Sequence, residues 1–306
     1  MKSINRYVVL GGSGFIGSSI IKELINKECK IICLDLIKPD FNHDNLEYIN
    51  MSFNKEYDFE TILKEDDIVI HCISTTNARS NKTTYQDFDE NVLSTIKLLD
   101  ACVSKKIKRL IFLSSGGTVY GNSKTLPLKE EYANNAISTY GLQKYVIEQT
   151  LYLYKVQYNL DYIVCRIGNI FGANQTIERG VGVICTFVNK IINNEEIQLF
   201  GDGNSIRDYI YVTDVIDAII KLIDYNGKET IFNIGSGIGY TVNELLDIII
   251  NNLDRKPIIN KIPVYNSDVD NNILDITKIK SEIGFSPKYT IEEGIKEVIK
   301  LTKKTR

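Results

Sequence analysis

Gly11-Gly12-Ser13-Gly14-Phe15-Ile16-Gly17 is the stretch of sequence on which the fold prediction depends. It follows a short apolar run, Tyr7–Leu10, and opens a longer segment, Phe15–Asn26, in which apolar residues recur every three or four positions. A strand, a glycine-rich turn and a one-sided helix in this order are typical of a dinucleotide-binding unit. Its three spaced glycines permit a tight turn and close backbone approach to a pyrophosphate, and the helix start offers N–H groups to the anion. We therefore expect the cofactor to bind along this stretch, Phe15 and Ile16 included.

A carboxylate follows the turn at the spacing that such a unit requires. The second strand candidate, Lys30–Asp35, ends about 20 residues after the turn, where Asp35 can accept hydrogen bonds from ribose hydroxyls. The same charge would repel a 2′-phosphate, and no arginine adjoins it, although Lys38 lies close by. The sequence thus favours NAD over NADP. The alternative is that Asp35 only caps the end of a strand.

The remaining pattern predicts an α/β fold with two parts. Up to residue 167, short β-branched runs alternate with one-sided helices, which predicts a doubly wound parallel sheet over residues 1–167. Beyond Gly168 the elements become shorter, and we expect a smaller α/β lobe over 168–306, with segments near 208–235 packing back onto the sheet. The further strand candidates are Asp67–His71, Arg109–Leu113 and Asp161–Ile167, and the further helix candidates are Asn91–Ser104 and Thr139–Tyr158.

Composition limits the function. The 306 residues carry a net charge of -3 with both signs interspersed, which disfavours a nucleic-acid partner. No apolar run reaches the roughly 20 residues of a membrane span, so we expect a cytoplasmic protein without a membrane partner. The six cysteines stand singly, and His43 and His71 have no neighbours at metal-ligand spacing. We therefore expect buried thiols and no metal site.

Tyr140-Gly141-Leu142-Gln143-Lys144 supplies a candidate acid–base pair. It opens a helix candidate, with Ser138 or Thr139 as N-cap, and residues four apart share one helical face. The Lys144 ammonium can then lie near the Tyr140 phenol and favour its ionised form. Taken alone the pattern also fits a solvated helix face. Its position after a Ser/Gly/Thr-rich strand end, Leu113–Gly121, places both segments at the crevice where open α/β sheets bind ligands.

At this point the sequence resembles the extended short-chain dehydrogenase/reductase family, and within it the UDP-glucose 4-epimerase-like sugar-nucleotide enzymes. The resemblance covers nearly the whole chain and implies a Rossmann-type sheet with a substrate lobe, bound NAD and a homodimer formed through the helices Asn91–Ser104 and Thr139–Tyr158. It rests on the motifs Gly11–Gly17, Asp35, Ser114–Gly121, Tyr140–Lys144, Arg166–Gly172 and Gly201–Val215.

The resemblance also implies roles for single residues. Tyr140 would exchange a proton with the sugar hydroxyl, while Lys144 would hold the nicotinamide ribose and lower the phenol pKa. The residues that match substrate positions are Asn169 and Arg207 at the diphosphate, Asn91 near the sugar and nicotinamide, and Asp275 near the nucleoside. A guanidinium suits phosphate oxygens because its fork of donors matches them. Arg207 would also fit a surface ion pair with Asp202 or Asp208, and Asn91 would also fit a helix N-cap.

The sequence departs from the family pattern at two places. In relatives the catalytic Ser or Thr lies four residues before the tyrosine of a Tyr-Gly pair, and that position is Gly116 here. The nearest hydroxyls are those of Thr118 and Ser115, of which we favour Thr118. Relatives also often place an aspartate against adenine where this chain has Ser52.

The resemblance leaves the reaction open between two alternatives. The first is 4-epimerisation of a UDP-sugar with tightly held NAD, which Asp35 favours mildly. The second is reduction of a dTDP-4-keto-6-deoxy sugar by NAD(P)H, which the missing serine at Gly116 keeps open. A 4,6-dehydratase is disfavoured because Gly117 and Thr118 replace the Asp-Glu pair that it requires. A non-catalytic dinucleotide-binding regulator is disfavoured by Tyr140 and Lys144.

Overall fold

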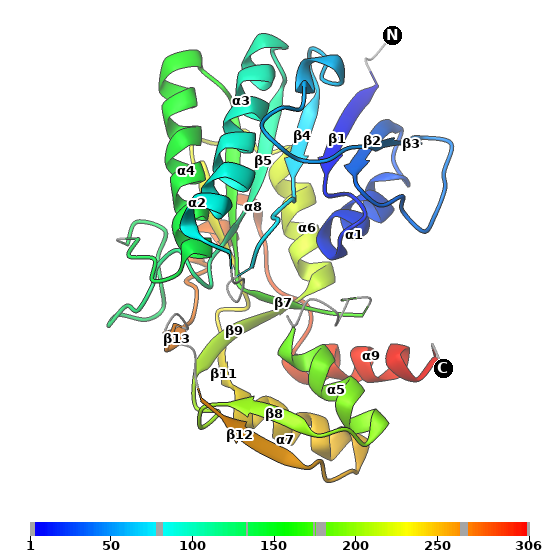
Figure 1. Ribbon diagram of the computed structural model, residues 1–306, viewed down its shortest axis with the longest axis vertical. Helices are drawn as coiled ribbons and strands as arrows, with labels where there is room; N and C mark the ends of the chain where they lie inside the picture. Colours follow the sequence, from blue (N-terminus) through cyan, green and yellow to red (C-terminus); the bar gives the residue numbers. More distant parts are fainter. Residues whose placement is uncertain are drawn as a thin grey trace.

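The chain folds around a seven-stranded parallel sheet, seen in the upper part of Figure 1. The computed structural model describes residues 4–77, 82–132, 134–173, 175, 182–263 and 269–304. Every strand predicted up to Ile167 is confirmed, whereas the two edge strands of the sheet, β3 and β10, were not predicted as strands. In spatial order the strands are β3 (Leu46–Asn50), β2 (Cys29–Asp35), β1 (Asn5–Leu10), β4 (Ile68–His71), β5 (Arg109–Ser115), β6 (Tyr162–Ile167) and β10 (Ile231–Ile234).

Helices cover both faces of this sheet because alternate strand residues point to opposite sides. Val9 and Ile70 belong to a buried cluster with residues of α1 (Phe15–Leu24) and α6 (Val212–Ile223). Val8 and Val69 belong to a second cluster with residues of α3 (Ser94–Ser104) and α4 (Thr139–Tyr158). Figure 1 shows these helix pairs on the two sides of the sheet, as a doubly wound fold requires.

The helix before β5 begins earlier than the sequence analysis predicted. It runs from α2 (Thr84–Asp87) through a π-helical turn, η2 (Phe88–Leu93), into α3. Thr83 is the N-cap, since its hydroxyl accepts from the N–H of Gln86 at 3.2 Å while the Gln86 side chain accepts from the N–H of Thr83 at 3.0 Å. The expectation that Asn91 opens this helix is wrong, because a capping box lies upstream of it.

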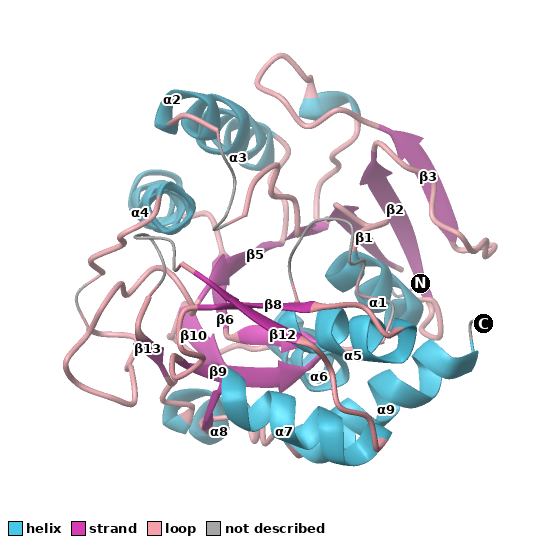
Figure 2. Cartoon of the chain, turned by 60° about the horizontal axis from the view of Figure 1, so that its bottom comes forward, coloured by secondary structure: helices cyan, strands magenta, loops and turns pink. Residues whose placement is uncertain are grey.

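A second lobe lies below the sheet in Figure 1 and comes to the front in Figure 2. Its apolar core is continuous with that of the sheet, since Ile20 of α1 and Val188 of α5 belong to one buried cluster. In the described ranges no helix has the length and apolarity to cross a membrane. The elements that complete the chain are η1 (Phe59–Thr61), β7 (Asn169–Phe171), α5 (Val183–Asn193), β8 (Ile197–Phe200), β9 (Ile206–Tyr211), β11 (Gly239–Thr241), α7 (Val242–Leu253), β12 (Ile259–Ile262), β13 (Asn271–Asn272), α8 (Thr277–Ile283) and α9 (Ile291–Lys304).

Candidate active site

The glycine-rich turn has the shape of a pyrophosphate cradle. Gly11 adopts φ +79°, and its N–H donates to the carbonyl of Leu34 at 2.8 Å, which folds the turn back on β2. A Cβ on Gly17 would lie 2.1 Å from the carbonyl oxygen of Gly11, so only glycine lets helix and turn approach this closely. Gly14 is the N-cap of α1 and supplies no side-chain acceptor. The backbone of Phe15 and Ile16 at the start of α1 therefore meets the requirements of an anion site.

Asp35 ends β2 beside this turn. One of its carboxylate oxygens accepts from the N–H of Ser13 at 3.0 Å and the other from the N–H of Ile37 at 3.2 Å. These bonds fix the carboxylate and leave each oxygen with capacity for a further donor, such as a ribose hydroxyl. Lys38 and Ser52 are both exposed. Cradle and carboxylate together fit a dinucleotide without a 2′-phosphate.

Tyr140 meets the end of β5. It lies in the first turn of α4, whose N-cap Ser138 accepts from the N–H of Gly141 at 3.1 Å. Burial raises the pKa of Tyr140 to about 12, while a hydrogen bond with the side chain of Ser115 acts to lower it. The phenol thus has a hydroxyl partner, and that partner is supplied by β5.

Lys144 lies one turn further along α4 and is only 4% exposed. Its ammonium donates to the carbonyl of Leu113 at 2.8 Å and lies 5.9 Å from the centre of the Tyr140 ring. Burial lowers the pKa of Lys144 to about 8, and the neighbouring side chains of Cys72 and Glu148 act in the opposite direction. The expected proximity to Tyr140 is present, but the group that lowers the phenol pKa in this arrangement is Ser115.

The two candidate hydroxyls differ in their surroundings. Ser115 contacts Tyr140, whereas the buried Thr118 hydroxyl oxygen has no hydrogen-bond partner in the part of the chain that the structure describes. The geometry therefore does not support our preference for Thr118. It also explains Gly116, because a Cβ there would lie 2.7 Å from the Leu274 side chain and 3.0 Å from the carbonyl oxygen of Arg166. A side chain at position 116 would therefore require Leu274 to move, and the nearest hydroxyl that contacts Tyr140 is that of Ser115.

Asn169 and Arg207 come from β7 and β9, at the junction of the two lobes. Asn169 lies beside the segment that follows β5, since a Cβ on Gly117 would lie 3.2 Å from its side-chain oxygen. Arg207 donates to the carbonyls of Ile206 and Asp270, each at 2.9 Å. Its guanidinium is thereby fixed against the backbone.

The carboxylates of Asp208 and Asp275 both accept hydrogen bonds from backbone N–H groups. The carboxylate of Asp208 accepts from Ser236, Gly237 and Leu274 at 2.7–3.1 Å. Asp275 accepts from the N–H of Thr277 at 2.8 Å, just before α8. Its expected place near a nucleoside stays a prediction.

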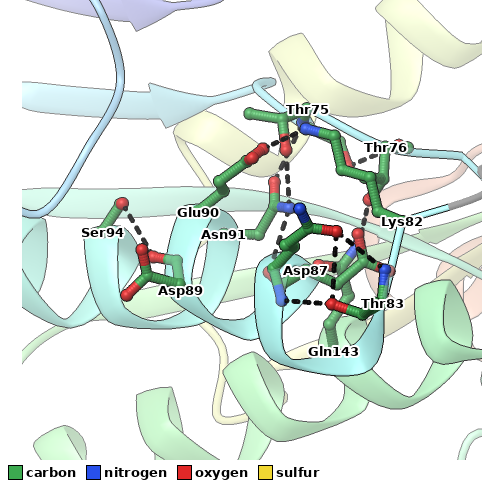
Figure 3. A network of polar contacts seen from close by, with 12 residues as sticks. Thr75, Thr76, Lys82, Thr83, Asp87, Asp89, Glu90, Asn91, Ser94 and Gln143 are labelled. Carbon is green, nitrogen blue, oxygen red and sulfur yellow. Dashed lines mark hydrogen bonds and ion pairs between the residues drawn. The ribbon is translucent and has the colours of Figure 1, made fainter.

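Asn91 does not cap a helix; it lies in the π-helical turn and is buried. Figure 3 shows its amide beside Thr75, in the segment that follows β4. The amide accepts from the Thr75 N–H at 2.9 Å and donates to the Thr75 hydroxyl at 2.8 Å. Asn91 therefore fixes the segment that follows β4. π-Helical turns are frequent at functional sites, which is consistent with this placement.

Sequence analysis missed a buried polar group next to Lys144. The side chain of Gln143 is 1% exposed and donates to the hydroxyl of Thr76 at 2.8 Å, and Thr76 in turn hydrogen-bonds Asp87 (Figure 3). The available signal was a glutamine directly before Lys144 and three residues after Tyr140, on the helix face that carries Tyr140. No group of three His, Cys, Asp or Glu side chains suited to a metal occurs among the residues that the structure describes.

Comparisons with known proteins agree with this geometry. A putative UDP-glucose 4-epimerase from Methanocaldococcus jannaschii is 38% identical over 95% of this chain and 96% of its own. A dTDP-4-dehydro-6-deoxyglucose reductase from Escherichia coli is 34% identical over 97% of both chains. The crystal structure of UDP-glucose 4-epimerase from Thermotoga maritima with UDP-glucose superposes with a TM-score of 0.91, at 32% identity over 98% of this chain and 99% of that one.

The family model that matches is that of the NAD dependent epimerase/dehydratase family, over residues 7–235. That range contains the glycine-rich turn, Asp35, and the Ser115–Tyr140–Lys144 group. The chain therefore belongs to the NAD-dependent epimerase/dehydratase family.

Proposed function

We propose that the protein is a UDP-sugar 4-epimerase. The observation that carries this proposal is the contact of Ser115 with Tyr140 next to Lys144, on the same sheet edge as the NAD cradle. The similarity to UDP-glucose 4-epimerases over almost the full length of both chains supports the substrate class.

The chain's own residues account for the proton transfers. When bound along the glycine-rich turn and Asp35, NAD would supply reversible hydride transfer at C4 of the sugar. Tyr140 takes the proton of the C4 hydroxyl and later gives it back, and Ser115 stabilises the phenolate by donating a hydrogen bond. The nearby ammonium of Lys144 would hold the ribose of the cofactor. Since burial raises the pKa of Tyr140 to about 12, ionisation of the phenol requires these positive and hydrogen-bonding neighbours.

The substrate would lie between the two lobes. Arg207 and Asn169 reach this junction from neighbouring strands, β9 and β7. A guanidinium already fixed on backbone carbonyls loses little freedom when it binds a diphosphate. We assign Arg207 to the diphosphate and Asn169 to the sugar side of it, while Asn91 acts through Thr75.

The second candidate is a 4-ketoreductase of a dTDP-4-keto-6-deoxy sugar. It is supported by the 34% identity to dTDP-4-dehydro-6-deoxyglucose reductase, which is close to the value for the epimerase relative. Both reactions would use the same acid–base group. They differ in whether the reduced cofactor is regenerated within each turnover.

One experiment separates the two. The purified chain is incubated with UDP-glucose, UDP-N-acetylglucosamine and a dTDP-4-keto-6-deoxy sugar, with and without added NADH, and the products are read by proton NMR. Inversion at C4 of a UDP-sugar without added NADH is expected. Turnover of the 4-keto substrate alone, with one NADH oxidised per product, would establish the reductase instead. Tyr140→Phe is the control that should retain NAD binding and lose either activity.

We further propose a homodimer formed through α4 and α3, the helix beside it. Apolar side chains on this face are exposed, with Tyr152 at 61% and Val156 at 65%. They lie four residues apart and so form one stripe. Sedimentation should give twice the chain mass, and Val156→Glu should give monomer. A monomeric wild-type chain would refute this assembly.

A further inference from the structure

A buried ion pair lies directly behind the proposed acid–base group. Glu148 is on α4, one turn after Lys144, and Arg166 is on β6. Their side chains are 0% and 1% exposed, and the closest of their atoms, Nη2 of Arg166 and Oε2 of Glu148, are 2.6 Å apart. The proton-transfer scheme above does not use either residue.

The position of Glu148 creates a competition for Lys144. Opposite charges four residues apart on one helix face attract each other, and burial strengthens the attraction. Lys144 nevertheless donates to the carbonyl of Leu113 at 2.8 Å, and it takes part in no ion pair with a described carboxylate. The Glu148 carboxylate must therefore be bound by other groups, which keep it from pairing with Lys144.

Arg166 and Ser114 occupy the carboxylate. The Nε of Arg166 donates to both oxygens of Glu148, at 3.2 and 3.1 Å, and Nη2 donates to Oε2. The Ser114 hydroxyl donates to Oε1. A guanidinium presents this fork of donors in a fixed plane, which a lysine at position 166 would lack.

Arg166 is itself held in place by the loop that follows β5. Its Nη1 donates to the hydroxyl of Tyr120 at 2.9 Å and to the carbonyl of Glu130 at 3.0 Å, and the Tyr120 hydroxyl donates to Asn233 at 2.7 Å. The guanidinium carbon lies 4.9 Å from the centre of the Tyr120 ring. These contacts hold the Arg166 guanidinium in the position where it donates to the Glu148 carboxylate.

The other titratable groups around Lys144 are neutral near pH 7. They are His71 at the end of β4, Cys72 directly after that strand, and Tyr140 from its own helix. Burial lowers the pKa of His71 to about 3 and raises the pKa of Cys72 and of Tyr140 to about 12. Among the groups that act on Lys144, the carboxylate of Glu148 is therefore the one whose charge must be neutralised.

We propose that Arg166 is a positioning residue for Lys144: by saturating Glu148 it keeps the ammonium on the Leu113 carbonyl, where it can reach the cofactor ribose. The inference rests on the proposed role of Lys144 in holding NAD. It predicts an asymmetry. Removal of the arginine lets Glu148 form an ion pair with Lys144. Removal of the glutamate charge leaves no carboxylate in this cluster that could draw Lys144 away from the Leu113 carbonyl.

The test compares Arg166→Met, Glu148→Gln and the double variant. NAD affinity is measured by calorimetry at pH 6, about two units below the wild-type midpoint, so that a moderately lowered midpoint still leaves Lys144 charged. The titration of Lys144 is followed by NMR of 13C-labelled lysine, assigned with Lys144→Met. R166M should bind NAD about 10-fold more weakly or worse, with the midpoint of Lys144 at least about one pH unit higher, since one unit equals a tenfold effect. E148Q should stay near the wild-type affinity with a lower midpoint, and the double variant should recover most of the loss.

Two outcomes would overturn the inference. One is a loss of NAD affinity in E148Q equal to that in R166M, which a purely structural ion pair predicts. The other is a double variant no better than R166M. If R166M does not fold, the titration midpoint of Lys144 in E148Q is the deciding measurement. An unchanged or raised midpoint would contradict the inferred attraction between Glu148 and Lys144. Neither readout needs turnover, so a chain that binds NAD as expected but epimerises no sugar refutes the proposed reaction and leaves this inference standing.

Discussion

Replacement of Ser115 and of Thr118 tests which hydroxyl serves the proposed chemistry. Ser115 is the described partner of Tyr140, and a hydrogen bond to a charged group contributes about 1.5–3 kcal/mol. If the bond strengthens as the phenol ionises, Ser115→Ala should lower kcat by about 10- to 100-fold. The Thr118 oxygen is buried without a described partner. Thr118→Val keeps the shape and should leave kcat within about 2-fold while raising stability by about 1 kcal/mol, because a buried unsatisfied hydroxyl is removed.

The assay is the pH profile of kcat with a UDP-sugar, accompanied by urea unfolding of both variants. Loss of the Ser115 bond raises the pKa of Tyr140 further, so the acid side of the profile should move to higher pH in S115A and remain in place in T118V. A larger loss of kcat in T118V than in S115A would refute the assignment. It would mean that the loop after β5 rearranges when substrate binds.

Three further predictions concern binding and stability. Because the pKa of Lys144 is lowered to about 8, its ammonium is lost above that pH, and NAD should bind about 10-fold more weakly at pH 9 than at pH 7; a flat profile in calorimetry would contradict this. His71 has a folded pKa of about 3 against about 6.5 when unfolded, so the unfolded chain binds the extra proton and stability falls as pH drops below 6.5. Between pH 7 and 5 urea unfolding should show a loss of about 2 kcal/mol that His71→Phe lacks and that the exposed His43→Phe retains. Gly17→Ala would place a Cβ 2.1 Å from the Gly11 oxygen and should weaken NAD binding by about 100-fold or more, whereas affinity within about 3-fold in calorimetry would show that the turn can shift.

The parts of the site that were predictable from the sequence are those fixed by local spacing. Gly11–Gly17 and Asp35 follow from one strand–turn–helix unit, and Tyr140 with Lys144 from one helical turn. The sheet was predictable for the same reason, because buried parallel strands are short apolar runs. β3 was missed because an edge strand with partly exposed residues lacks that run.

The parts that were not predictable depend on how distant segments meet. The choice of Ser115 over Thr118 depends on the packing of Leu274 against Gly116, which no local pattern encodes. The pairing of Glu148 with Arg166 joins a helix to a strand 18 residues later. The start of the helix before β5 is different. A threonine followed three residues later by glutamine stands in the sequence, and the error lay in starting the helix at Asn91.

The last strand of the upper sheet comes from far along the chain. β10 pairs with β6 at one edge of the sheet, and α6 packs beside α1 on one of its faces. A nascent chain that has emerged only as far as Ile167 therefore has a sheet with an unpaired edge and an uncovered apolar face. Chaperone engagement of the nascent protein should end after residues 212–234 emerge, and a fragment ending at Ile167 should aggregate rather than fold as a separate NAD-binding unit.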